Sequence, residues 1–137
     1  MNCVYLSLTT LFFLFPVFVF LTNKRQNIYE SVLATLLTIN IILSLLFWTY
    51  PIENSMFHIY DGIFGKISYI FFSIYILFIK PIKYKLKMLS LVILLFVSVV
   101  FYYSNHYSRM NWCSKAHLGW HSIFHFLCSF GCSLAFI

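Results

Sequence analysis

The sequence predicts an all-α fold, a polytopic transmembrane helical bundle of about five spans that forms a single domain over residues 1–137. Three observations predict it. The chain of 137 residues is 62% hydrophobic and only 9% charged, its mean hydropathy is +0.90, and its apolar residues form long continuous runs. A soluble domain of this size does not need so much apolar surface, and the runs are too long for strands.

Five apolar segments are long enough to form spans, which need roughly 17–25 residues each. The first segment has no basic residue ahead of its apolar run and is followed by basic residues. A retained helix is therefore favoured over a cleaved signal peptide. The predicted spans are residues 4–22, 28–50, 61–79, 86–103 and 117–137.

Basic residues predict the orientation of the spans, because cytoplasmic loops carry an excess of lysine and arginine. The loops at residues 23–27 and 80–87 fall on one side of a five-span chain and hold six of the nine basic residues. The N-terminus is therefore expected outside and the C-terminus in the cytoplasm. The basic residues that give the net charge of +6 stand in short runs beside apolar segments, so this charge reflects the topology. The expected partners are therefore membrane lipids and not nucleic acid.

The other charged residues and the cysteines have simple interpretations. The lysines from Lys80 to Lys87 are expected to anchor the topology in the way just described. Lys66 follows Asp61 by five residues and lies almost opposite on the same helix, so it is expected to snorkel or to pair elsewhere. Cys3 and Cys113 share the outer side, where a disulfide is permitted.

The unusual polar residues of the spans fall in one leaflet of this topology. Asn40, Ser44 and Trp48 are spaced four residues apart and share a helix face. Ionisable groups inside a membrane are costly and usually face the interior of a bundle, which predicts a single polar site in the outer half of the bundle. The ionisable residues concerned are His58, Asp61, His117, His121 and His125.

Three of these histidines, His117, His121 and His125, are spaced four residues apart in the last span. Neutral imidazole is the commonest metal ligand, and an i, i+4 pair on a helix can share one ion. His117 and His125 lie roughly 12 Å apart along the helix axis, so only one pair binds an ion and another helix must supply a third ligand. From the spacing alone, the favoured role of these histidines is to form hydrogen bonds between helices, in preference to binding a metal ion.

The motif HSIFHFLCSFG at residues 121–131 resembles the last transmembrane helix of the CREST superfamily. This superfamily includes alkaline ceramidases, progestin and adiponectin receptors, and myomaker with its relatives. The stretch LTTLFFLFPVFVFLTNKRQNIYESV, which contains Glu30, is similar to the first hairpin of the myomaker-type branch. YDGIFGKISYIFF, which contains Asp61, resembles the third helix of that branch.

The resemblance implies a zinc ion bound by one histidine of the second helix and the histidine pair of the last. Carried over, His121 and His125 are ligands, Asp61 handles the zinc-bound water and Ser44 assists. Such an ion lowers the pKa of its water toward about 7 and polarises a carbonyl. The implied function is a ceramidase-like, metal-dependent hydrolase of lipid amide or ester bonds.

The chain departs from the family pattern in its ligands and in its length. Trp48 stands where the second helix should supply a histidine, and indole does not ligate zinc. His58 is the expected third ligand, and HLGWH at residues 117–121, similar to a ceramidase form, makes His117 with His121 the alternative pair. The family has seven spans, so five leave an incomplete wall that a homo-oligomer would complete.

Other functions stay open at this point. The runner-up is a non-enzymatic protein that retains the fold with a degenerate site and acts as a receptor or in membrane remodelling or fusion. Haem ligation ranks lowest, because only His58 could oppose the histidines of the last span. Cys128 and Cys132 continue the face of His121 and are interpreted as small packing residues in preference to metal ligands.

Overall fold

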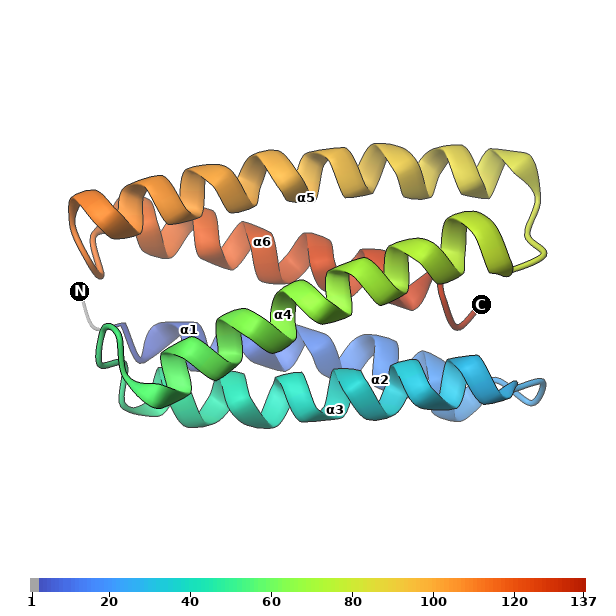
Figure 1. Cartoon of the computed structure of the whole chain (residues 1–137), viewed down its shortest axis with the longest axis horizontal. Helices are drawn as coiled ribbons and strands as arrows, with labels where there is room; N and C mark the ends of the chain where they lie inside the picture. Colours follow the sequence, from blue (N-terminus) through green and yellow to red (C-terminus); the bar gives the residue numbers. More distant parts are fainter. Residues whose placement is uncertain (1–2) are drawn as a thin grey trace.

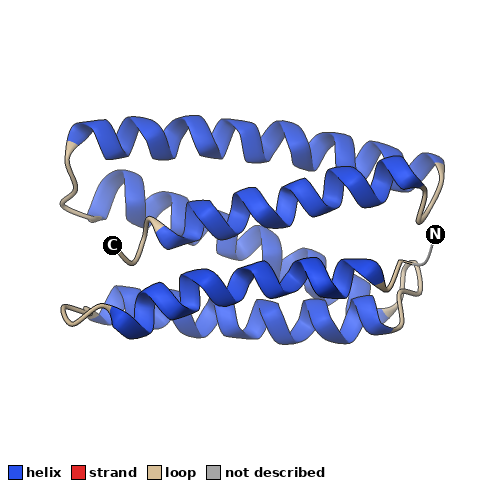
Figure 2. Cartoon of the chain, turned by 180° about the vertical axis from the view of Figure 1, so that it is seen from behind, coloured by secondary structure: helices blue, strands red, loops and turns tan. Residues whose placement is uncertain are grey.

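Every predicted span forms a helical rod in the computed structural model, which describes residues 3–137. The rods are helices throughout, and the loops lie at the two ends of the bundle (Figure 2). Among the described residues there is no strand. The elements are α1 (Tyr5–Thr10), the 3-10 turn η1 (Leu11–Phe13), α2 (Leu14–Thr22), α3 (Ile28–Thr49), α4 (Met56–Ile74), the π-helical turn η2 (Tyr75–Ile79), α5 (Tyr84–Met110) and α6 (Lys115–Ser133).

Four of the rods are long and apolar enough to cross a membrane by length and composition: Tyr5–Thr22, Ile28–Thr49, Met56–Ile79 and Tyr84–Met110. These helices mark the chain as a membrane protein. The fifth rod, α6, is not among the four; it has 19 residues and carries three histidines. It packs against α5 and against α1 and α2.

The third and fourth rods are longer than the predicted spans. The third helix begins at Met56, because Ser55 caps it with a side-chain oxygen that accepts a hydrogen bond from the His58 N–H at 3.3 Å. The fourth continues past Tyr103 to Met110. Polar residues expected in a loop therefore form two further helical turns.

Successive rods run antiparallel, and the third crosses the bundle at an angle (Figure 1). At its start α4 lies beside α3, and toward its end it approaches α5. The contacts agree with this arrangement, because α4 packs on α3 whereas α5 meets the third rod at η2. The first half of α4 and the second half of α5 are therefore not packed together.

A disulfide between Cys3 and Cys113 marks one end of the bundle, with the two Cα atoms 5.3 Å apart. It joins the start of the first rod to the loop between α5 and α6, on the side where the sequence placed both cysteines. We call this the disulfide end. The basic loops at residues 23–27 and 80–87 lie at the other end, together with the C-terminus (Figure 1), and we call it the basic end.

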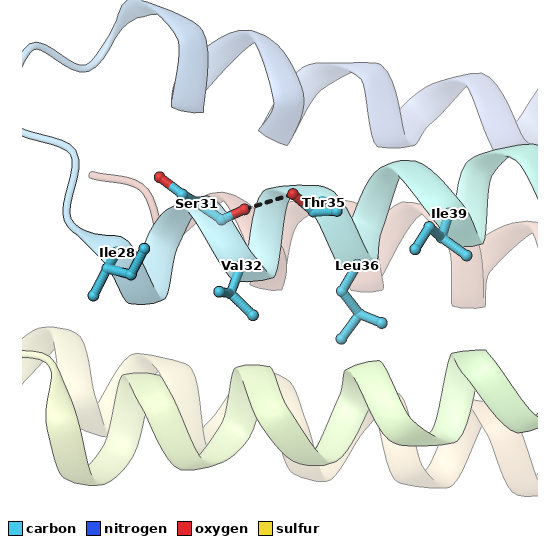
Figure 3. A pocket seen from close by; sticks show the side chains of 6 residues that line it. All are labelled: Ile28, Ser31, Val32, Thr35, Leu36 and Ile39. Carbon is cyan, nitrogen blue, oxygen red and sulfur yellow. Dashed lines mark hydrogen bonds between the residues drawn. The ribbon is translucent and has the colours of Figure 1, made fainter.

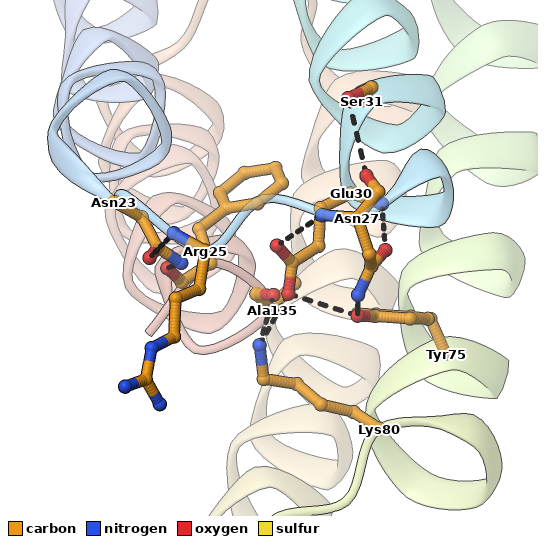
Figure 4. A network of polar contacts seen from close by, with 9 residues as sticks. Asn23, Arg25, Asn27, Glu30, Ser31, Tyr75, Lys80 and Ala135 are labelled. Carbon is orange, nitrogen blue, oxygen red and sulfur yellow. Dashed lines mark hydrogen bonds and ion pairs between the residues drawn. The ribbon is translucent and has the colours of Figure 1, made fainter.

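A buried ion pair closes the basic end (Figure 4). Lys80 Nζ lies 2.7 Å from Glu30 Oε1, and the two side chains are 7% and 3% exposed. Lys80 also donates to the Ala135 carbonyl at 2.8 Å, and the Tyr75 hydroxyl donates to the same Glu30 oxygen at 3.0 Å. Lys80, expected with the other lysines of its loop to anchor the topology, thus has a further role, because its charge joins three segments inside the bundle.

Candidate functional site

A cavity of about 790 Å³ lies between α3, α4, α5 and α6. Every residue that the sequence singled out for a site lines it. The structure thus brings the histidines, the carboxylate and the serine of three helices together in one space. These residues are Ser44, His58, Asp61, His117, His121 and His125.

The polar face of α3 connects three helices at this cavity. The Ser44 hydroxyl is hydrogen-bonded to the Thr10 hydroxyl of α1 at 3.1 Å, and it also interacts with the Asp61 carboxylate of α4. One helical turn away, the Asn40 amide donates to the Ser68 hydroxyl of α4. Ser44 therefore links Thr10 and Asp61, as well as lining the cavity.

His121 and His125 form a close pair on α6, with ring centroids 4.6 Å apart. Each Nδ1 is hydrogen-bonded to a hydroxyl of a neighbouring helix: His125 to Thr9 at 2.8 Å and His121 to Ser104 at 2.9 Å. Neither Nε2 atom has a hydrogen bond within residues 3–137, and neither is sealed from accessible space. The hydroxyls fix the rings and leave both Nε2 atoms for a ligand.

His58 and His117 have the same local role at the starts of two helices. In each case a serine caps the helix and the histidine three residues later turns its Nδ1 back to a loop N–H. Asn54 donates to His58 at 2.9 Å, and Cys113 donates to His117 at 3.2 Å. Both donors have a left-handed backbone, with φ near 60°. The repeated S-x-x-H pattern, a relative of the capping box, was the sequence signal for this role.

Trp48 lies directly beside the histidine pair. Its ring meets the edge of His121 at 4.9 Å between centroids and stacks on Trp112 at 6.0 Å. Within residues 3–137 its Nε1 is the one buried side-chain nitrogen or oxygen without a hydrogen-bond partner. The position at which the family resemblance implies a histidine therefore does face the pair, but an indole fills it.

The side chains beside the pair do not complete a three-ligand zinc centre. Catalytic zinc sites take three protein ligands, and in the part of the chain that the structure describes no group of three His, Cys, Asp or Glu side chains is arranged to hold a metal ion. His58 stacks on Phe47 with centroids 4.7 Å apart and is turned toward its own loop. Zinc binding stays a prediction that would rest on His121 and His125.

Two cations also line the cavity, and the sequence reasoning missed both. Lys66 was expected to lie away from Asp61, yet both border the same space. The two residues are about 140° apart on the helix, so residues from two sides of α4 line the cavity. Arg109 borders the cavity from α5.

A second hollow, on α3, has none of these features (Figure 3). It is an open groove lined by aliphatic side chains and two hydroxyl residues, and the Thr35 hydroxyl donates to the Ser31 carbonyl of its own helix. No titratable side chain lines it, so the central cavity is the candidate site. The groove residues are Ile28, Ser31, Val32, Thr35, Leu36 and Ile39.

Comparison with known proteins does not extend this description: no family model matches the chain, and neither a curated protein nor a solved structure is significantly similar to it. The resemblance to the CREST superfamily therefore rests on the short motifs alone. Function has to be argued from the geometry of the cavity.

Proposed function

We propose that this protein is a multi-pass integral membrane protein that binds a lipid-like amphiphile inside its helical bundle. The observation that carries the proposal is the division of the cavity. Titratable groups such as Asp61 and His121 line it toward the disulfide end, beside aromatic residues such as Trp48. Toward the basic end most of the lining is apolar, as at Phe72 and Ile93. Its volume of about 790 Å³ is typical of small-molecule sites.

Two independent features support the proposed orientation, with the N-terminus outside and the C-terminus in the cytoplasm. Cytoplasmic loops are rich in basic residues, and two such loops share the basic end. Disulfides persist in oxidising compartments, and the Cys3–Cys113 bond lies at the other end. In this orientation the polar half of the cavity lies in the outer leaflet and α6 is the fifth span.

A zinc-dependent hydrolase of lipid amide or ester bonds is the second candidate. The specific observation in its favour is that hydroxyl partners orient His121 and His125 through Nδ1, while Asp61 and Ser44 line the same cavity. A zinc ion, when bound, would polarise the carbonyl of the lipid. If no zinc ion binds, amphiphile binding alone is consistent with a receptor or a membrane-remodelling protein.

Blocking the cavity is expected to abolish amphiphile binding. Gly65 lines the cavity, and a Cβ built there meets no atom within 4 Å. Gly65→Phe should therefore place a ring in the ligand's space and weaken binding of a fluorescent single-chain lipid by at least about tenfold, which corresponds to about 1.4 kcal/mol. The measurement is equilibrium binding to protein purified in mild detergent.

Gly119→Phe is the matched control. This glycine also has open space around it, but it lies on α6 outside the cavity lining. Its substitution should leave the affinity unchanged, although both variants gain similar helix propensity. Equal losses in the two variants, or no saturable binding by the wild type, would show that the cavity is not the binding site.

Metal analysis tests the second candidate. If the histidine pair holds zinc, His121→Ala and His125→Ala should each lose the bound metal. Trp48→His should raise zinc affinity, because it adds an imidazole beside His121 and completes three ligands. His106→Ala is the control, since His106 is exposed on α5 and does not line the cavity. Equal zinc content in wild type and His121→Ala would remove the hydrolase candidate and leave ligand binding in place.

A further inference from the structure

Lys66 is a cation near the middle of the third rod, and no carboxylate of the described residues forms an ion pair with it. It lies ten residues after Met56, the first residue of α4, which is roughly 15 Å along the helix axis. Among the described residues, Lys80 and Glu30 form the one ion pair, so neither Lys66 nor Arg109 is neutralised by the chain. A charge within a span normally pairs, so the unpaired Lys66 indicates a function. Arg109 lies in the last turn of α5, at the disulfide end.

Exposed residues of both α4 and α5 line the cavity, and Lys66 and Arg109 are among them. Toward the basic end Tyr69 joins the two helices, with its hydroxyl 2.8 Å from the Ser98 hydroxyl and donating to the Leu94 carbonyl at 3.1 Å. Toward the disulfide end α4 presents Gly62 and Gly65, and a Cβ at either would meet no atom within 4 Å. These two positions therefore leave room for a ligand beside α4.

The chain offers few carboxylates that could neutralise these cations. The protein has three acidic residues in all. Glu30 is paired with Lys80, Asp61 interacts with Ser44 inside the cavity, and Glu53 lies in the loop between α3 and α4. The missing negative charge is therefore expected on the ligand.

The side chains around these cations favour a phosphate group. Asn105, Ser108 and Arg109 all line the cavity and are spaced i, i+3 and i+4 on one face of α5. They supply amide, hydroxyl and guanidinium donors, and Lys66 supplies an ammonium from α4. A guanidinium matches the geometry of phosphate oxygens, and an ammonium adds a point charge.

We infer that the ligand is a single-chain lipid with a phosphate headgroup, which enters between α4 and α5 so that its phosphate pairs with Lys66 and Arg109. Its hydrocarbon chain lies in the apolar half of the cavity, along Phe72 and Ile93. The inference rests on the proposed amphiphile site and adds the class of its ligand. A cavity of about 790 Å³ suits one chain of this kind.

Headgroup competition tests this inference. Oleoyl lysophosphatidate and monooleoylglycerol share a chain and a glycerol and differ in the phosphate. Against a fluorescent single-chain lipid, the wild type should bind the phosphate lipid at least about tenfold more tightly. Lys66→Met should remove most of this preference and Lys66→Arg should keep it. Arg109→Met should reduce it, and Lys85→Met, at the exposed start of α5, should leave it unchanged.

The outcomes separate the inference from the proposed function. Equal affinity for the two lipids, or an undiminished preference in Lys66→Met, would overturn the phosphate ligand while amphiphile binding stands. Oleic acid that binds as tightly as lysophosphatidate would replace the phosphate by a carboxylate and overturn the inference in the same way. If the wild type binds none of these lipids, the proposed function fails together with the inference.

Discussion

Lys80→Met is expected to lower the free energy of unfolding by about 3–5 kcal/mol. The substitution keeps most of the volume of the side chain but leaves the Glu30 carboxylate without its cation, inside a site where that residue is 3% exposed. It also takes the donor at 2.8 Å away from the Ala135 carbonyl. Denaturant titration of the protein in mixed micelles measures the change.

Two variants separate the effect of charge pairing from that of simple substitution. Lys83→Met removes a lysine of the same loop that is exposed, and it should change stability by less than about 0.5 kcal/mol. The double variant Glu30→Met with Lys80→Met removes both charges and should recover much of the loss, because an apolar pair is often as stable as a buried ion pair. A double variant no more stable than Lys80→Met would show that the Ala135 contact dominates.

Removing the disulfide is expected to cost about 2–4 kcal/mol. Cys3 and Cys113 are 110 residues apart in sequence, so the bond closes a loop that includes most of the chain and restricts the unfolded state. Cys3→Ser with Cys113→Ser should unfold at a lower denaturant concentration than the oxidised wild type. The same titration provides the measurement.

Treatment of the wild type with a reductant is the internal comparison, because it should reproduce the loss seen in the double serine variant. Cys132→Ser is the control, since it removes a free thiol and keeps the Cys3–Cys113 disulfide, so its stability should stay close to that of the oxidised wild type. A reduced wild type as stable as the oxidised protein would mean that the bond does not limit the unfolded state. In that case the contacts of the first rod with α3 and α6 determine the stability of the disulfide end.

The sequence predicted the helices and their shared polar space well, because both depend on local patterns. Continuous apolar runs set the rods, and the spacing of four residues between Asn40, Ser44 and Trp48 put them on the face that lines the cavity. The placement of His121 beside His125 followed from helical geometry in the same way. These are properties of one helix at a time.

Interactions between distant segments could not be predicted in the same way. Lys80 stands in a basic loop and has the sequence context of a solvated residue, and its partner Glu30 is 50 residues away. Whether Lys66 lines the cavity depends on the angle at which α4 crosses the bundle, and no local sequence pattern specifies that angle. Tertiary packing also decided the extension of α5 to Met110, where polar residues had predicted a loop.

The turn η2 limits how the chain can vary in length. In this turn the N–H of Lys80 donates to the carbonyl of Tyr75 at 2.7 Å, five positions back, so the helix holds one residue more than an α-helical turn would. Deleting a residue there would rotate everything after it by about 100° and point the ammonium of Lys80 away from the carboxylate of Glu30. A change of length earlier in α4 would rotate this turn in the same way, because α4 continues directly into η2. Insertions and deletions should therefore be tolerated in the loop before Met56 and not within the third rod.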